Sequence, residues 1–140
     1  MILTWGFVLL CMAVIFYLSH QIASDSSETS SWLTIKIYDL FKIELSTYFV
    51  RKTAHAIEFG GLCFALNLAY FASFLRFSPF VSLASTLFYA STDELHQYFV
   101  EGRACQLRDV FVDLCGAVIV TAVIIALYLI YKRYKEKREV

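Results

Sequence analysis

The sequence has 140 residues, of which 59% are hydrophobic and 17% are charged, and its 12 basic residues balance its 12 acidic ones. A soluble domain of this length carries charge on about a quarter of its residues. The composition therefore excludes an ordinary soluble domain and predicts an all-α, polytopic membrane protein whose partner is the lipid bilayer. We expect a single domain over residues 1–140, because no internal repeat is apparent.

The first apolar run, residues 2–18, is just long enough to cross a bilayer as a helix. At about 1.5 Å per residue it reaches across most of a hydrocarbon core of roughly 30 Å. A signal peptide is the alternative interpretation. The membrane span is favoured because the run lacks a basic segment before it and a clean small-x-small cleavage site near Ser19.

Two polar segments follow the first run. Residues 24–31, Ser-Asp-Ser-Ser-Glu-Thr-Ser-Ser, are small and polar, which predicts a solvated loop. From Trp32 to Leu45, apolar and charged residues mix at a spacing that fits an imperfect amphipathic helix, lying on the membrane or over the mouth of the helix bundle. A loop with scattered apolar residues is the alternative for this second segment.

Three more apolar runs predict membrane spans at about residues 53–75, 80–98 and 110–131. A short basic turn, Arg76 to Pro79, separates the first two of these. Five basic residues crowd residues 132–140, which favours a cytoplasmic tail over a nucleic-acid-binding segment, so nucleic acid is not an expected partner. The expected fold is a four-transmembrane-helix bundle with the amphipathic helix between its first two spans.

The positive-inside rule predicts the orientation of this bundle. Because Arg76 follows the second span and the basic tail follows the fourth, both termini are expected in the cytoplasm. The opposite ends of the four spans each carry polar residues, which then converge on the outward side. Charged groups at membrane depth cost roughly 2.5 to 3.5 kcal/mol each and are normally functional. This outward polar cluster is therefore the expected site.

Helix spacing groups the polar residues into shared faces. Arg51, His55 and Glu58 are related by i, i+4 and i+7, and Asp109, Asp113 and Gly116 by a similar spacing. Glycines 60, 61 and 116 would let neighbouring helices approach closely. The candidate catalytic residues are His55, Glu58, Asp93, Glu94, His96, Asp109 and Asp113. The candidate substrate-binding residues are Ser19, Gln21, Arg51, Lys52, Gln97, Arg103 and Arg108.

Most of these candidates lie in four segments: 16–21, 51–59, 93–103 and 109–116. In this order and at these spacings, the segments resemble the motifs of the VanZ-like family over nearly the whole chain. That family consists of small bacterial membrane proteins and is named from a member associated with resistance to the glycopeptide teicoplanin. The resemblance implies a place in the bacterial cytoplasmic (inner) membrane and an envelope role, modifying or shielding a lipid-linked surface component. It implies no particular reaction.

The chemistry of the polar cluster stays open between several interpretations. The arginines and Lys52 suit an anionic head group, such as that of a lipid-linked envelope precursor, with His96 or Glu94 exchanging a proton in an enzyme. A divalent metal is a second candidate, with ligands His55, Glu58, Asp93, His96 and Asp113. A third interpretation is a structural or partner-binding subunit, in which the charges only pair with one another. A transport path fits less well, because no inverted repeat is evident.

Overall fold

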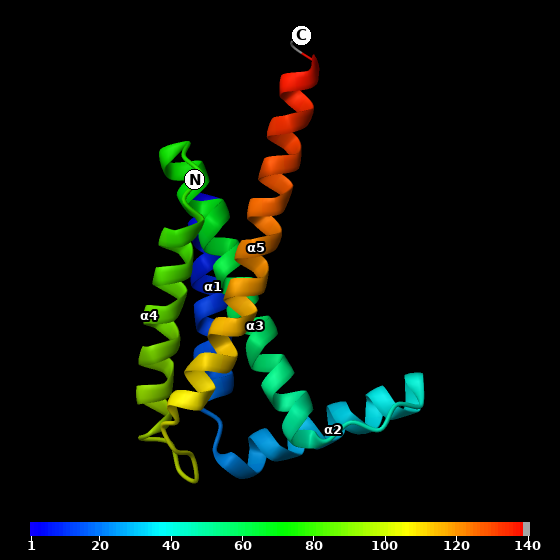
Figure 1. The fold of residues 1–140 in the computed structure, drawn as a ribbon. Coiled ribbons are helices and arrows are strands. Elements are labelled where there is room, and N and C mark those ends of the chain that lie inside the picture. The colour runs from blue at the N-terminus through cyan, green and yellow to red at the C-terminus, as the bar shows by residue number, and fades with distance from the viewer. Residues whose placement is uncertain (139–140) are drawn as a thin grey trace.

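The structure is a computed structural model that describes residues 1–138, and within them it contains five helices and no strand. The helices are α1 (Ile2–Ser19), α2 (Ala23–Phe41), α3 (Thr47–Phe74), α4 (Pro79–Gln97) and α5 (Leu107–Arg138). Four of them run along one long axis, while α2 projects sideways from one end of the bundle (Figure 1). Helices α3 and α5 run in one direction and α1 and α4 in the other, so both chain ends lie at the end opposite to α2.

Of the four expected membrane spans, three correspond to helices that are long and apolar enough to cross a membrane. By length and composition, α1, α3 and α5 could each cross a membrane. The helix predicted at residues 80–98 is present as α4, but its composition is too polar for it to be identified as a membrane span. Five polar side chains of α4 point into the bundle, where they are buried: Ser82, Thr86, Asp93, Glu94 and Gln97. The mean hydropathy of the segment includes these side chains, although they do not lie on the outer face of the helix.

The predicted loop at residues 24–31 is wrong, because this segment is the first part of α2. Hydroxyl side chains normally disfavour helix interiors by competing for backbone groups. Here they donate back to carbonyls one turn earlier instead: Thr29 to Asp25, Ser30 to Ser26 and Ser31 to Ser27. The helix predicted from residue 32 is confirmed as far as Phe41, where Lys42 adopts a left-handed conformation that ends it.

Two other boundaries differ from the predicted ones. Helix α3 begins at Thr47, not at 53, because the hydroxyl of Ser46 accepts a hydrogen bond from the Phe49 N–H and caps the helix. Helix α5 continues to Arg138, so the basic segment expected as a tail after residue 131 is helical as far as the structure describes it. Residues 139–140 lie outside the described part. The basic turns of α5 extend beyond the rest of the bundle (Figure 1).

Helices α3 and α5 pack most closely at two glycines. A Cβ atom on Gly116 would lie 1.8 Å from the carbonyl oxygen of Ala56, and one on Gly60 would lie 3.2 Å from a methyl group of Val120. The expected close approach is therefore confirmed for Gly60 and Gly116. It is wrong for Gly61, which has no neighbour within 4 Å of its Cβ position. The contact at Gly116 brings the polar face of α5, with Asp109 and Asp113, against the polar face of α3.

The outer surface of the bundle is apolar along α1, α3 and α5. Large hydrophobic side chains remain exposed on each of these helices, among them Leu9, Phe71 and Ile119. The inner core is smaller and is built around Phe59, Ile15 and Leu62. A continuous apolar exterior around a small core fits a protein surrounded by lipid.

Candidate functional site

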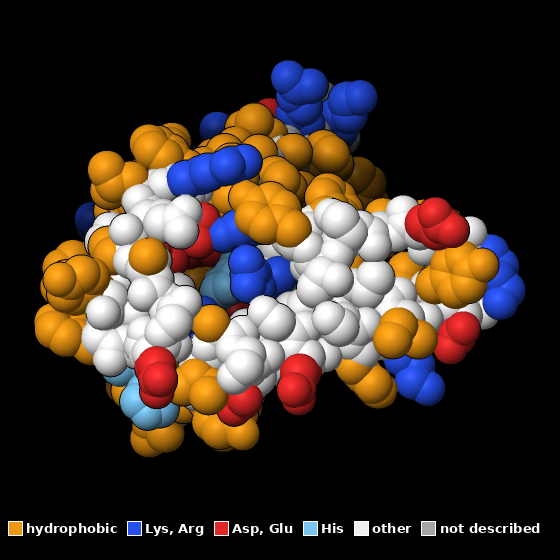
Figure 2. Space-filling model, turned by 90° about the horizontal axis from the view of Figure 1, so that it is seen from below, with side chains coloured by type: hydrophobic (Ala, Val, Ile, Leu, Met, Phe, Trp, Pro, Cys, Tyr) orange, Lys and Arg blue, Asp and Glu red, His pale blue; other side chains and the backbone are white. Residues whose placement is uncertain are grey.

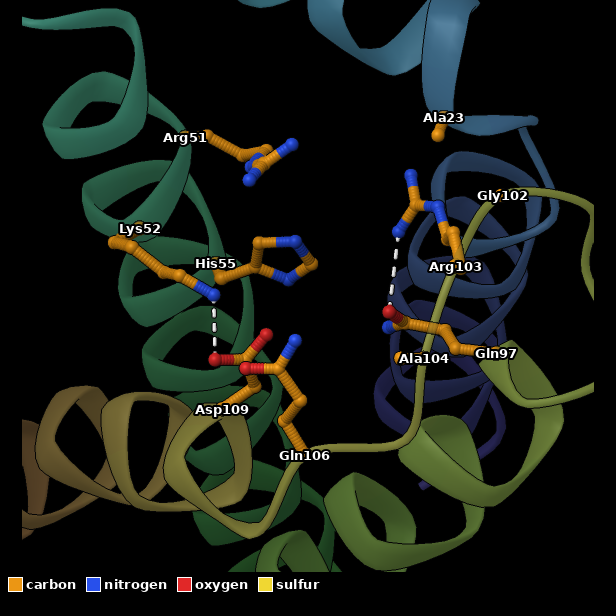
Figure 3. Close-up of a pocket in the computed structure, with 10 residues that line it drawn as sticks. All are labelled: Ala23, Arg51, Lys52, His55, Gln97, Gly102, Arg103, Ala104, Gln106 and Asp109. Atoms are coloured by element: carbon orange, nitrogen blue, oxygen red, sulfur yellow. Dashed lines mark hydrogen bonds and ion pairs between the residues drawn. The ribbon is translucent and has the colours of Figure 1, made fainter.

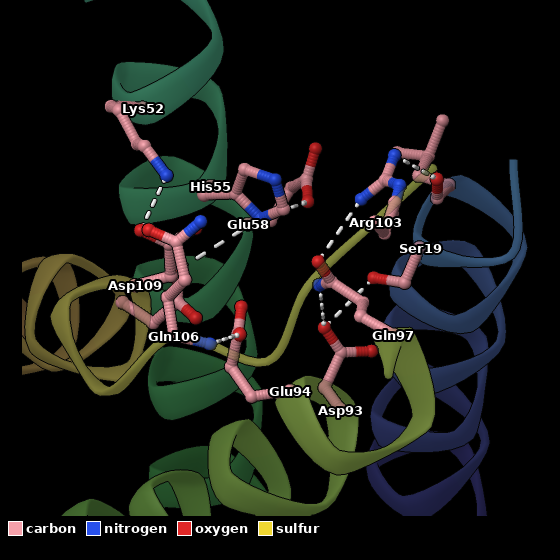
Figure 4. Close-up of polar contacts among 12 residues, drawn as sticks. Ser19, Lys52, His55, Glu58, Asp93, Glu94, Gln97, Arg103, Gln106 and Asp109 are labelled. Atoms are coloured by element: carbon pink, nitrogen blue, oxygen red, sulfur yellow. Dashed lines mark hydrogen bonds and ion pairs between the residues drawn. The ribbon is translucent and has the colours of Figure 1, made fainter. Parts of the chain in front are cut away.

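The polar side chains converge at the end of the bundle where α2 projects. They come from the end of α1, the start of α3, the end of α4, the loop 98–106 and the start of α5 (Figure 4). Seen along the bundle axis, this face is hollowed, and basic side chains and a histidine lie inside the hollow (Figure 2). The expectation that four polar clusters share one end of the molecule is confirmed.

Arg103 joins the ends of α1 and α4. Its Nε donates to the carbonyl of Gln21 at 2.9 Å, its Nη2 to the carbonyl of Leu18 at 3.4 Å, and its Nη1 to Oε1 of Gln97 at 3.2 Å. The two carbonyls lie at the C-terminal end of α1, where backbone oxygens have no helical partner and attract positive charge. Burial, reinforced by the like charge of Arg51, lowers the pKa of Arg103 from its ordinary value. A guanidinium stays charged nonetheless.

Asp93 continues this network toward the core. Its Oδ2 accepts from the Ser19 hydroxyl at 2.8 Å and from Nε2 of Gln97 at 2.9 Å. All three side chains are buried. The order Ser19, Asp93, Gln97, Arg103 therefore forms one chain of hydrogen bonds through the polar end (Figure 4). The candidate Gln21 takes part through its backbone carbonyl.

Two further carboxylates hold the start of α5. Asp109 forms an ion pair with Lys52 at 2.5 Å. Glu94 accepts a hydrogen bond from the backbone N–H of Gln106 at 2.9 Å, just before the helix begins. Because acceptors near a helix N-terminus satisfy unpaired N–H groups there, Glu94 fixes the position of this turn.

His55 lies between the cavity and two carboxyl groups, of which that of Asp113 is buried and that of Glu58 is partly exposed. Its Nδ1 is 3.9 Å from Oδ1 of Asp113 and 4.0 Å from Oε2 of Glu58, too far for hydrogen bonds. Neither oxygen of Asp113 has a hydrogen-bond partner within residues 1–138, although its side chain is only 2% exposed. Buried polar groups are normally satisfied, and exceptions call for an explanation. Asp113, Glu58 and His55 form the least satisfied group in this part of the site.

A cavity of about 110 Å³ opens at this end of the bundle, and we call it the basic cavity. Arg51 and Lys52 on α3 lie on one side of it, Arg103 lies on the other, and His55 is exposed to it (Figure 3). Lys52 is neutralised by Asp109. Arg51 has no hydrogen-bond or ion-pair partner among residues 1–138. Its guanidinium points toward that of Arg103 across the open space.

Two candidates from the sequence belong neither to the lining of this cavity nor to the contacts described above. His96 packs against Phe16 and lies 3.2 Å from the ring of His20, an exposed residue. Arg108 is exposed and lies over the ring of Tyr48. Sequence reasoning missed Ala23 and Gln106, which line the cavity. Ala23 lies just before the segment predicted as a loop and has no polar side chain, and Gln106 contacts Glu94 through its backbone N–H.

The expected metal ligands do not form a set. Among the side chains of residues 1–138, no three from His, Cys, Asp and Glu are grouped so that they could hold a metal ion. His96 lies beside His20, and Oδ2 of Asp93 already accepts hydrogen bonds from Ser19 and Gln97. The arrangement therefore does not fit a divalent metal.

The fold and the site define a class of protein: an all-α chain with three helices of membrane-spanning length and a basic, carboxylate-backed cavity at one end. Residues 4–130 match the model of the VanZ/LLP1 family, and the chain belongs to this family. The resemblance seen in the motifs is thereby confirmed. Comparisons with curated proteins and with solved structures gave no match.

Proposed function

We propose that this VanZ-like protein binds the phosphate-bearing head group of a lipid or of a lipid-linked envelope precursor in the basic cavity. The observation that carries the proposal is the pair formed by Arg51 and Arg103 across the cavity, in which Arg51 has no partner among the described residues. Two cations that point at one another are mutually repulsive. An anion between them would relieve this repulsion and accept hydrogen bonds from both guanidinium groups.

The rest of the cavity supports a single anionic group rather than a larger charge. Lys52 is paired with Asp109, and the carboxyl groups of Glu58 and Asp113 lie behind His55. The positive charge left for a ligand is therefore that of the two arginines. A phosphate monoester matches this charge, and its oxygens match the fork geometry of guanidinium.

Arg51→Gln tests this proposal directly. Because Arg51 has no partner in residues 1–138 and repels Arg103, its replacement should not lower the thermal stability. Binding of glycerol phosphate should weaken by about 1.5 to 3 kcal/mol, roughly 10- to 150-fold, the range for hydrogen bonds to charged groups. Calorimetry on protein in neutral lipid nanodiscs measures this. Arg76→Gln, an exposed arginine at the other end of the bundle, is the matched control. Equal affinities in all three proteins would refute head-group binding here.

The proposal includes a location in the bacterial cytoplasmic membrane with both termini in the cytoplasm. Helices α3 and α5 run in the same direction, so the chain between them has to return along the bundle. We infer that α4 makes this return with its polar face buried against its neighbours. The turn between α3 and α4, which contains Arg76, and the basic turns of α5 lie at the end opposite to the cavity. By the positive-inside rule this directs the cavity outward.

Cysteine labelling tests this orientation. Cys105 is exposed in the loop at the cavity end. A membrane-impermeant maleimide should label it in intact cells, and should not label Ser78→Cys or Lys137→Cys in a Cys105→Ser background. Both introduced cysteines should become reactive once the membrane is opened. Labelling of residue 137 in intact cells would reverse the orientation and place the cavity inside.

Membership of the family supports a finer proposal about physiology. We infer that the protein modifies or shields a lipid-linked component of the envelope and thereby lowers susceptibility to glycopeptides such as teicoplanin. Occupation of a phosphate head group at the outer surface is a physical route to such shielding.

Catalysis on the bound head group is a second candidate, favoured by the position of His55. Its ring lines the cavity, and its Nδ1 lies 3.9 Å from Oδ1 of Asp113. A small movement of either side chain would let the carboxylate orient the histidine as a general base. If the protein is an enzyme, His55→Gln should abolish turnover of a phosphate ester by the purified protein and leave binding of that ester within about twofold of the wild type. If the wild-type protein turned over no phosphate ester, catalysis would be refuted and the binding function would remain.

A further inference from the structure

A second cavity, of about 80 Å³, lies directly behind the basic cavity, beneath α2. We call it the apolar compartment. The two cavities share three lining residues, Arg51, His55 and Arg103. Since the same side chains border both spaces, a ligand held between the two arginines in the basic cavity would be next to the compartment.

The compartment presents mostly apolar surface. Leu18 of α1, Leu33 of α2, and Val50 and Ala54 of α3 contribute aliphatic side chains. Gln21 and Ser26 also line it, as do Thr29 and Ser30, whose hydroxyls donate to carbonyls within α2. Glu58 contributes the one carboxylate, at the His55 edge. Apolar walls of this kind favour hydrocarbon over water.

The compartment is also continuous with the surface that lipid would cover. Leu33, on its rim, is 37% exposed, and its neighbours Trp32 and Ile35 are exposed along α2. Helix α2 projects sideways at the level of the polar end, where a membrane-embedded bundle meets the head groups (Figure 1). An apolar path therefore leads from the compartment to the outer surface.

We propose that the two cavities are parts of one site for an amphiphile, a phosphate monoester of a single hydrocarbon chain, with the phosphate between Arg51 and Arg103 and the first carbons of the chain beneath α2. The inference rests on the proposed function and narrows its substrate class. A soluble phosphate, such as glycerol phosphate, would fill only the basic cavity.

A chain-length series tests this inference. The full-length protein in phosphatidylcholine nanodiscs is titrated with inorganic phosphate, glycerol phosphate, and methyl, butyl and hexyl phosphate, with empty nanodiscs subtracted for partitioning. The affinity should rise by about fourfold for each buried methylene until the compartment is full. Equal affinities for inorganic, methyl and hexyl phosphate would overturn the inference and leave head-group binding intact.

Two variants test where the hydrocarbon chain of the ligand binds. Ala54→Leu fills the compartment without touching the basic cavity, so it should abolish the gain with chain length and leave inorganic phosphate binding unchanged. Ala122→Leu, at an exposed alanine of α5, is the matched control and should keep the gain. Leu33→Asn makes the rim polar at a half-exposed position and should also reduce it. A full gain in both Ala54→Leu and Leu33→Asn would overturn the inference, whereas no binding of any phosphate would refute the head-group site itself.

Discussion

Replacing Gly116 with alanine is expected to separate α3 from α5 and to destabilise the protein by about 3 kcal/mol, the upper part of the range for overpacked interiors. A methyl group there would lie 1.8 Å from the carbonyl oxygen of Ala56. The obstacle is backbone, which cannot rotate away as a side chain can. The helices would have to move apart by more than an ångström, and the contact between His55 and Asp113 would open with them.

Thermal unfolding in detergent and abundance in membranes measure this effect. Gly61→Ala is the matched control, because it is the same change in α3 with no atom within 4 Å of the new methyl group. Alanine is the better helix former by about 1 kcal/mol, so the control should be as stable as the wild type or more so. A Gly116→Ala protein with the wild-type melting temperature would show that the α3–α5 contact is looser than the structure describes.

Replacing Arg103 with alanine should have the second-largest effect, a loss of about 3 kcal/mol. The change removes three hydrogen bonds from a charged donor and leaves the carbonyl of Gln21 without its partner at the end of α1, whereas the carbonyl of Leu18 keeps the backbone N–H of Gln21. Hydrogen bonds to charged groups contribute about 1.5 to 3 kcal/mol, although several on one side chain do not add fully. Phosphate binding should fall as well, because Arg103 borders the basic cavity.

The companion variant Arg103→Lys distinguishes charge from geometry. An ammonium keeps the charge but cannot reach three acceptors with a planar fork, so an intermediate stability is expected. Arg108→Ala is the matched control, because Arg108 is exposed and contacts only the ring of Tyr48 among the described residues. Its loss should change stability by less than about 1 kcal/mol. Equal stabilities for the two alanine variants would contradict the role of Arg103 in joining α1 to α4.

Local patterns in the sequence predicted the individual helices well where composition was unambiguous. The apolar runs at 2–18 and 110–131 became α1 and the middle of α5, because lipid-compatible side chains are needed all around such helices. The start of α2 was mispredicted because Thr29 and Ser30 satisfy their hydroxyls within the helix, which composition does not reveal. Helix α4 is too polar on average to be identified as a membrane span, because its buried polar side chains lower the mean hydropathy of the segment.

The sequence by itself determined the helical class, the gathering of polar groups at one end and the family, because hydropathy, positive charge and motif spacing are properties of single segments. Only the tertiary structure decided which charges are paired. It joined Lys52 to Asp109, tied Arg103 to α1 and left Arg51 facing an open cavity. It also placed His96 beside His20. These outcomes depend on helix rotation and on the close approach at Gly116, which the spacing of residues along one helix cannot specify.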